Sequence, residues 1–268
     1  MSILVSLING FRHTNRLWPV IGFWWALSII ESVMGKGILP QAVLTRFGSF
    51  QPAAQLISNV LAFFVGGVLF ILLLGGTLGL MKRVVRGEAG PLKEFFVAGL
   101  RWFWPLLGCS ALLLAISLLV FVTGWRFLYP AFSHLGLLVF GLWALLAMIF
   151  TTAIFHVLIS LVEENQGIGA AFRSSSRFVW SHLYRTSGLL FLLTLLVVVL
   201  GVGLSRALFS LFELLSPKVA EEYLALLQWG LQGLVIGGGS AFFSVFTIAT
   251  LYVHYHGNRT QTEIAAIP

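Results

Sequence analysis

Long apolar stretches separated by short polar segments make up most of this chain. Six of the stretches have the roughly 20 mainly apolar residues that a helix needs to cross a bilayer. They cover residues 18–38, 54–80, 103–122, 135–162, 187–212 and 224–253. Each is apolar on all sides, whereas the strands of an outer-membrane barrel alternate apolar with polar residues. The pattern therefore predicts an all-α fold, a polytopic membrane bundle of six transmembrane helices.

Composition and the distribution of charge support a membrane location and predict an orientation. Hydrophobic residues make up 59% of the chain, charged residues only 9%, and the mean hydropathy is +0.98. Eleven of the 16 Lys and Arg residues lie before the first span, after the sixth, or between the second and third or fourth and fifth spans. Because cytoplasmic segments carry the excess of basic residues, we expect a multi-pass protein of the cytoplasmic (inner) cell membrane with both termini inside.

The net charge of +7 then lies mostly on the cytoplasmic side, where it favours contact with anionic lipid headgroups. Nucleic acid is the other common partner of a basic protein, but here the charges flank apolar helices. We therefore expect membrane lipids as partners, and no nucleic acid.

An internal repeat organises the spans into three pairs. Residues 18–22, 104–108 and 184–188 each begin with an aromatic residue and end with glycine, where the first, third and fifth spans begin. The second, fourth and sixth spans each end at a polar residue followed by glycine, at residues 86–87, 166–167 and 256–257. We expect one membrane domain, 1–268, with repeated units at about 1–87, 88–167 and 168–257 and a short cytoplasmic tail, 258–268.

The segments that precede the first, third and fifth spans have the pattern of amphipathic helices lying at the membrane surface. We call them the basic segments, because their polar faces carry Arg12, Arg16, Lys93, Arg101, Arg173 and Arg177. Anchoring in the headgroup layer is one interpretation of this pattern. The other is a docking surface for a cytoplasmic partner or for a lipid headgroup.

These features together resemble a known group of proteins. Basic segments that enter spans through an aromatic residue and a glycine, three hairpins, and a last span that closes with aromatic and basic residues at 251–259 are similar to poorly characterised bacterial and archaeal six-span proteins related to the glycerophosphoryl diester phosphodiesterase membrane domain. Residues 167–175 resemble the segment before the fifth span of that group. Because these relatives often lack a catalytic domain, the resemblance implies an embedded accessory module more than an enzyme.

Few polar residues lie at membrane depth. Glu31, Asn59, Arg206 and His156 are the candidates for an intramembrane polar site, and Glu31 could pair with Arg206 toward the outer half. An ionisable residue in a span is a candidate for a substrate or proton pathway. Long side chains near span ends, however, also reach the interface without any such role.

Glycine spacing predicts how the helices pack. Gly75 and Gly79 in the second span, and Gly233 and Gly237 in the sixth, have the four-residue spacing that lets helix backbones approach closely in lipid. A broken helix around the glycine run 237–239, lining a substrate site, is the alternative.

Catalytic, cofactor and metal motifs are not found in the sequence. The chain has no Asp, and it contains no zinc-ligand spacing, P-loop or dinucleotide-binding glycine motif. Ser110, with His156 and His254, loosely resembles the serine and histidine dyad of rhomboid-type intramembrane proteases, but the surrounding residues differ. We therefore predict no cofactor and no enzymatic activity.

Three functions follow from these patterns. The leading hypothesis is a non-enzymatic integral membrane accessory or scaffold module, which acts with a partner or with lipid headgroups at the cytoplasmic face. The alternative is a transporter for a small amphipathic or lipid-like substrate. The third is an intramembrane hydrolase that uses Ser110.

Overall fold

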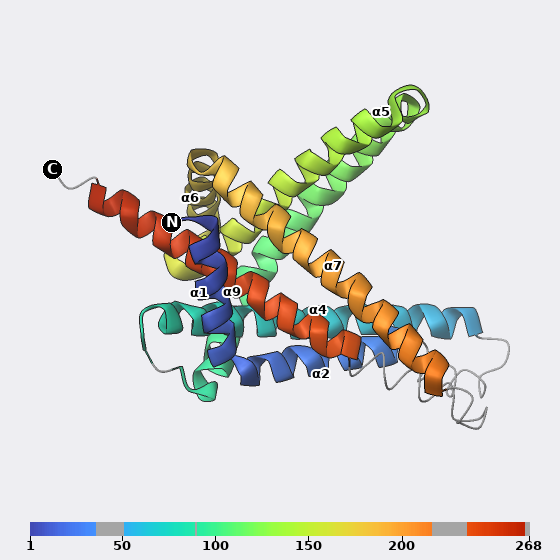
Figure 1. Cartoon of the computed structure of the whole chain (residues 1–268), viewed down its shortest axis with the longest axis horizontal. Coiled ribbons are helices and arrows are strands. Elements are labelled where there is room, and N and C mark those ends of the chain that lie inside the picture. The colour runs from blue at the N-terminus through green and yellow to red at the C-terminus, as the bar shows by residue number, and fades with distance from the viewer. Residues whose placement is uncertain (36–50, 89, 216–234, 266–268) are drawn as a thin grey trace.

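A computed structural model describes residues 1–35, 51–88, 90–215 and 235–265, and it places the side chains at 1–30, 64–88, 90–116, 118, 153–214 and 235–259. All regular secondary structure in this part of the chain is helical, which confirms the all-α prediction (Figure 1). The helices are α1 (Ile3–Arg16), α2 (Trp18–Gly35), α4 (Gln51–Val85), α5 (Leu92–Glu163), α6 (Ile168–Ser181), α7 (Leu183–Leu215) and α9 (Gly237–Ala265).

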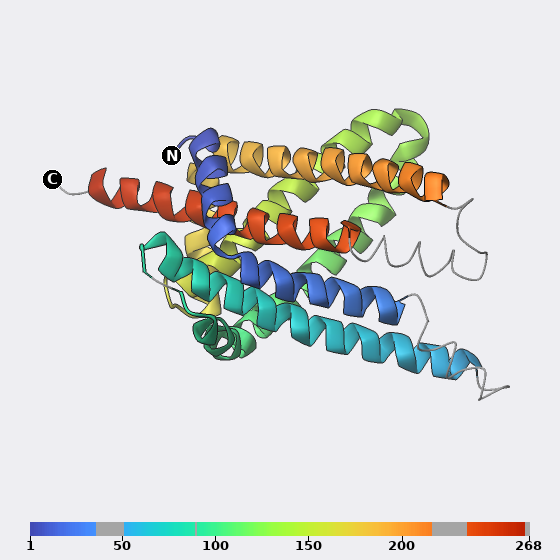
Figure 2. The same cartoon turned by 60° about the horizontal axis from the view of Figure 1, so that its bottom comes forward.

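The long helices form a bundle that is capped at one end by α1 and α6. Figure 2 shows α2, α4, α7 and α9 running in a similar direction, with both termini at the end where α1 crosses the bundle. Helix α5 folds back on itself, and its two arms lie side by side in both views (Figures 1 and 2). We call the end that holds α1, α6 and the connection between α4 and α5 the basic end.

Three helical segments are long and apolar enough to cross a membrane: Phe64–Val85, Leu92–Ile116 and Leu183–Leu214. Shorter apolar helical stretches are found at Trp18–Ile30 and Ala153–Glu163 among the residues with described side chains. These findings are those of a membrane protein. The number of six spans stays a prediction, since residues 36–50 and 216–234 lie outside the described part of the chain.

Two of the three basic segments form separate helices. Leu17 follows α1 and His182 follows α6, and at both residues the backbone leaves the helical conformation for a single position before α2 or α7 begins. The third basic segment is instead the first part of α5, which continues into the apolar stretch without a break. The distance along the chain from the helix start, Leu92, to the aromatic residue of the predicted repeat, Trp104, is about one helical turn shorter than the corresponding distance in the other two basic segments.

Small residues bring each basic segment close to a helix of the bundle. Gly10 of α1 packs against Thr250 of α9, where an added Cβ would overlap the threonine. Gly99 of α5 faces the carbonyl oxygen of Leu72 in α4, and an added Cβ would lie 2.7 Å from that oxygen. In α6, the hydroxyl of Ser175 donates a hydrogen bond of 3.2 Å to the carbonyl of residue 153 in the second arm of α5. The basic segments are therefore fixed to the bundle by close backbone approach.

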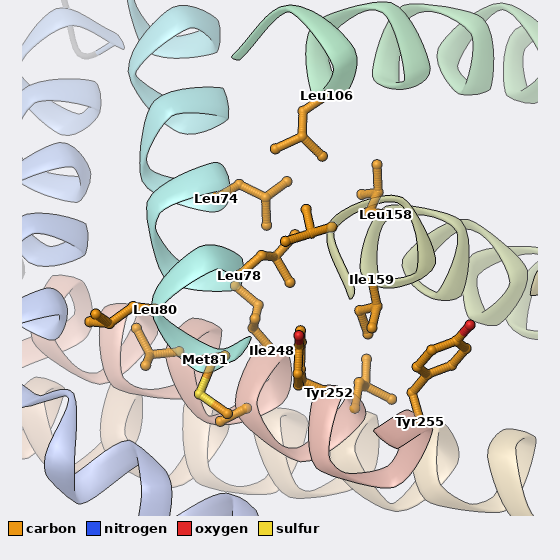
Figure 3. Packing of buried hydrophobic residues seen from close by; sticks show 14 of the residues in the cluster. Leu74, Leu78, Leu80, Met81, Leu106, Leu158, Ile159, Ile248, Tyr252 and Tyr255 are labelled. Atoms are coloured by element: carbon orange, nitrogen blue, oxygen red, sulfur yellow. The ribbon is translucent and has the colours of Figure 1, made fainter. Parts of the chain in front are cut away.

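The buried core lies where α4, both arms of α5, and α9 meet. Figure 3 shows Leu78, Leu106, Ile159 and Tyr252 converging from these helices. All four side chains are fully buried. This core lies directly beside the basic end, so that the polar groups there pack against buried apolar side chains.

The glycine-rich stretches take part in helix packing, as their spacing predicts. Gly75 and Gly79 of α4 contact the first part of α5. At the start of α9, Gly237 and Gly238 lie beside Trp25 of α2, and the two residues before them are π-helical. Gly233 lies outside the described residues.

We predict that Gly99→Ala destabilises the protein by about 1–3 kcal/mol, because the new methyl group overpacks the contact with the Leu72 carbonyl. This cost outweighs the gain of up to about 1 kcal/mol in helix propensity. Thermal unfolding in detergent, followed by circular dichroism, measures the change. Gly67→Ala is the control, since no atom lies within 4 Å of its added Cβ, and it should leave stability unchanged or raise it. Equal effects of the two substitutions would contradict this packing.

Candidate functional site

Two adjacent carboxylates organise the basic end. Glu163 is the last residue of α5 and Glu164 is its C-cap. The carboxylate of Glu163 accepts a hydrogen bond from the hydroxyl of Tyr252, lies 3.1 Å from Nδ1 of His256 and pairs with Arg86 at 3.3 Å. Two of these partners belong to α9 and the third, Arg86, directly follows α4, so this side chain ties the ends of three helices together.

Glu164 makes an equally complete set of contacts on the other side. Its carboxylate accepts hydrogen bonds from Tyr255, from Ser174 of α6 at 2.9 Å and from Gln166 at 2.7 Å, and it pairs with Arg259. The two carboxylates thus connect α4, α5, α6 and α9. Both are saturated with donors, which is the condition under which burying a charge is tolerated.

Lys82 caps the C-terminal end of α5. The ammonium group of Lys82 donates hydrogen bonds to the carbonyl oxygens of Val162 and Glu163, at 2.9 and 2.8 Å. The last carbonyls of a helix have no partner within the helix and carry its negative dipole end. Lys82 therefore satisfies these carbonyls with a cation from α4.

The environment of Glu163 strongly favours its charged form. Its side chain is 8% exposed and lies one residue beyond the predicted span 135–162. Burial alone would raise the pKa of Glu163, but hydrogen bonds from His256, Tyr252 and Arg86 outweigh burial and lower the pKa to about 2. The group is a structural anion at any physiological pH.

A basic groove, which we call groove A, lies on the α4 side of this carboxylate pair. It has a volume of about 700 Å³ and runs between the end of α4 and the first turns of α5. Five cations and two carboxylates are among its lining residues: Lys82, Arg83, Arg86, Lys93, Arg101, Glu88 and Glu94. The groove therefore has a surplus of positive charge.

A second groove, groove B, lies on the α6 side of the pair. Its volume is about 740 Å³, and α6, α9 and the end of α5 form its walls. Arg173, Arg177 and Arg259 line it together with a single carboxylate, that of Glu164. Like groove A, it can attract anions.

A separate buried polar cluster joins α1, α7 and α9. His254 is fully buried, with its Nδ1 3.0 Å from the hydroxyl of Ser6 and its Nε2 3.5 Å from the hydroxyl of Thr186. Asn258 lies one turn further along α9 and contacts the same imidazole. Because its contacts come from α1, α7 and α9, the histidine has a packing role here.

An apolar cavity of about 430 Å³ lies deeper in the bundle, among α2, α4, α5, α7 and α9. Trp24, Phe70, Gly201 and Phe243 are among its lining residues, and a few serine and threonine hydroxyls are its polar groups. Helix α7 borders it with side chains that are mostly exposed, so the cavity has an apolar wall that faces lipid in a membrane.

The structure places the predicted docking residues as follows. Arg12, Arg16, Lys93, Arg101, Arg173 and Arg177 are all exposed at the basic end. Two of them line groove A and two line groove B. The two arginines of α1 lie on the remaining basic segment.

The predicted intramembrane polar residues are only partly placed. The side chains of Glu31 and Asn59 lie outside the described part, so their proposed partnership stays a prediction. Arg206 is exposed on α7, roughly 35 Å along that helix from its start. His156 is buried at the basic end, where its ring stacks on Phe178 with centroids 5.2 Å apart. Arg206 and His156 therefore do not form one site.

None of the described contacts brings Ser110 together with His156 or His254. Ser110 is half-buried in the first arm of α5, while His254 contacts α1 and α7. Among the residues with described side chains, no group of three His, Cys, Asp or Glu residues could hold a metal ion.

Sequence reasoning missed the carboxylate pair and its partners. Two adjacent glutamates in an otherwise basic connection, and two tyrosines three residues apart at the end of the last span, were the available signals. Residues three apart share a helix face, so Tyr252 and Tyr255 could have been expected to point the same way. That they meet Glu163 and Glu164 depends on how α9 packs on α5.

We predict that the free energy of unfolding falls by about 3 kcal/mol between pH 4.5 and pH 2 through protonation of Glu163. A lowered native-state pKa means that the stabilisation is complete above the ordinary pKa and is lost as pH falls through the native one. Chemical unfolding in detergent across this range measures the loss, which should be absent in Glu163→Gln. Glu88→Gln, at a more exposed carboxylate, should keep it; a wild-type pH profile in Glu163→Gln would contradict the assignment.

Comparison with protein-family models, with curated proteins and with solved structures gave no match. The similarity to six-span proteins related to the glycerophosphoryl diester phosphodiesterase membrane domain therefore stays a prediction. The roles of the residues at the basic end rest on geometry: saturated carboxylates that tie the helices, flanked by two grooves whose excess arginines and lysines can bind anions.

Proposed function

We propose that this protein is a non-enzymatic accessory module of the cytoplasmic membrane, a scaffold that holds a partner protein at the membrane surface. One observation carries the proposal: the six predicted docking residues are exposed at the same end of the bundle. The helices that carry them are fixed by the close contacts of Gly10, Gly99 and Ser175. A rigid basic surface suits docking, because little entropy is lost when it binds.

We also propose six spans in three repeated units, with the basic end in the cytoplasm. Helices α1 and α2 are joined by the single residue Leu17, and α6 and α7 by the single residue His182, in support of a repeat. The excess of basic residues at this end supports a cytoplasmic orientation.

The polar chemistry of the basic end supports a non-enzymatic role. A general base works best when its pKa lies near the working pH, whereas the pKa of Glu163 is lowered to about 2. Glu164 accepts hydrogen bonds from three side chains and pairs with Arg259. Both carboxylates therefore act as structural ties.

Charge complementarity suggests the partner's chemistry. The exposed cations of the basic end would attract a surface rich in Asp and Glu, and such steering raises the rate of association. We therefore propose a partner with an acidic contact surface.

Site-specific photo-crosslinking in native membranes tests the scaffold. A photoreactive amino acid at Arg16 or Arg173 should give an adduct with the same protein from both positions, because both belong to one docking surface. The same group at Arg206, which is exposed on α7, is the control and should not yield that adduct. Unrelated adducts at the two basic positions, or none, would refute a shared docking surface.

A transporter for a small amphipathic or lipid-like substrate is the second candidate. The apolar cavity of about 430 Å³ beside α7 favours it, since its wall of apolar side chains and few hydroxyls suits a hydrocarbon chain.

Filling this cavity tests the transporter. Gly201 lines the cavity and has no atom within 4 Å of an added Cβ, so Gly201→Phe should place a ring in it. We expect this variant to lower the flux of a fluorescent phospholipid across proteoliposomes at least about tenfold, if the cavity is the route. Gly203→Phe is the matched control, because this glycine is equally open but does not line the cavity. Equal flux through both variants would exclude the cavity as the route.

A further inference from the structure

The three basic segments can be aligned by the first residue of each helix. These residues are Ile3 in α1, Leu92 in α5 and Ile168 in α6, and each follows an N-cap residue with extended backbone. In this register, the small residues that contact the neighbouring helix share position 8: they are Gly10, Gly99 and Ser175. The alignment therefore agrees with the packing of all three segments.

The same register aligns an arginine followed by an aromatic ring. Position 10 is arginine in all three helices, and position 11 is His, Trp or Phe: Arg12 and His13, Arg101 and Trp102, Arg177 and Phe178. Aligning the chain at the aromatic residues where the spans begin does not show this correspondence, because α5 is about one turn shorter there.

Grooves A and B use the same face of their basic segments. Positions 3, 6, 7, 10 and 11 line groove A as Glu94, Val97, Ala98, Arg101 and Trp102, and they line groove B as Ala170, Arg173, Ser174, Arg177 and Phe178. In both grooves, the opposite wall includes the C-terminal end of the helix that the basic segment packs against: this helix is α4 in groove A and α5 in groove B. The two grooves thus occupy equivalent positions on two of the three basic segments.

Each groove retains two cations that bind neither a described carboxylate nor, as Lys82 does in groove A, the carbonyl oxygens at a helix end. In groove A, Arg83 pairs with Glu88 and Glu94, and Arg86 pairs with Glu163. Lys93 and Arg101 form no ion pair with the described residues. In groove B, Arg259 pairs with Glu164, while Arg173 and Arg177 form none with the described residues.

Exposed tryptophans indicate the level at which the grooves lie. Trp104 and Trp180 both occupy position 13, three residues after the shared arginine, and they are 74% and 73% exposed. Tryptophan is enriched where a protein meets the headgroup layer, because its ring is apolar while its N–H is polar. One helical turn separates these rings from Arg101 and Arg177, so both arginines lie at headgroup depth when the rings are at the interface.

We propose that grooves A and B are equivalent binding sites, each for one phosphate ester of an anionic membrane lipid, with Arg101 and Arg177 as the corresponding phosphate-binding residues. This inference deepens the proposed function, because it rests on the same basic surface and names a ligand for it. A planar guanidinium can donate two parallel hydrogen bonds to a phosphate, and a second cation balances the remaining charge.

Details of the two grooves suit this ligand. The guanidinium of Arg101 lies 5.6 Å from the ring centroid of Trp102, and one of its nitrogens is 3.4 Å from the side-chain oxygen of Asn165. These contacts orient the side chain within groove A before a ligand arrives. In groove B, Ser174 lines the wall beside Arg173 and Arg177, and its hydroxyl donates a hydrogen bond to Glu164.

Native mass spectrometry of the protein purified in mild detergent tests the proposal. With added phosphatidylglycerol, the wild-type chain should retain two lipid molecules in preference to phosphatidylcholine. Arg101→Gln and Arg177→Gln should each weaken one of these binding events by at least about tenfold, and the double variant should lose both. Thermal unfolding of each variant checks that the fold is intact.

Arg206→Gln is the matched control, since it removes one exposed arginine from α7 outside the grooves. It should bind two lipids like the wild type. Equal loss in this control, or unchanged binding in the double variant, would overturn the proposal, because binding would then depend only on net charge or on other residues.

A parallel titration with glycerol 3-phosphate separates the two sources of a phosphate ester. Tight binding of phosphatidylglycerol alone supports a lipid headgroup; tight binding of glycerol 3-phosphate without the lipid would overturn the lipid assignment and assign a soluble ligand. The measurement uses the purified chain without a partner. Lipid binding without a shared crosslinked protein would therefore refute the scaffold and support the lipid sites. A shared crosslinked protein without lipid binding would support the scaffold and refute the lipid sites.

Discussion

The carboxylates of Glu163 and Glu164 are the interaction on which the basic end depends. Buried ions are tolerated only when donors saturate them, and here tyrosine, arginine, serine and glutamine side chains from three other parts of the chain supply those donors. The same contacts occupy Arg86 and Arg259, which would otherwise add to the charge of the grooves. The pair therefore holds the helices together and also determines which cations remain available on either side.

The hydrophobic pattern predicted the helical class well, because in lipid every backbone group must be satisfied within its own segment and apolar runs of this length leave only a helix. Gly75 and Gly79 likewise indicated close packing in advance, since a four-residue spacing is a local property of one helix. Such features are readable because they require no knowledge of the neighbouring helix.

The site was only partly predictable. Exposed cations such as Lys93 and Arg173 could be recognised from the polar face of a segment, but the grooves that they line require knowing which helix packs opposite. The proposed correspondence of Arg101 with Arg177 is not visible when the predicted repeat is aligned at the aromatic residues, because α5 is about one turn shorter there than α1 and α6. Contacts between residues far apart in sequence, such as Tyr255 with Glu164, follow from tertiary packing alone.

The missing turn in α5 has a mechanical consequence. A single non-helical residue, Leu17 after α1 and His182 after α6, separates each of these helices from the long helix that follows. In α5, helical conformation continues from the basic segment into the apolar arm without a break. The backbone hydrogen bonds of one helix therefore connect groove A directly to the apolar arm of α5, whereas a non-helical residue separates the α6 side of groove B from α7. Although the two grooves share their lining positions, they differ in how they couple the surface to the membrane interior.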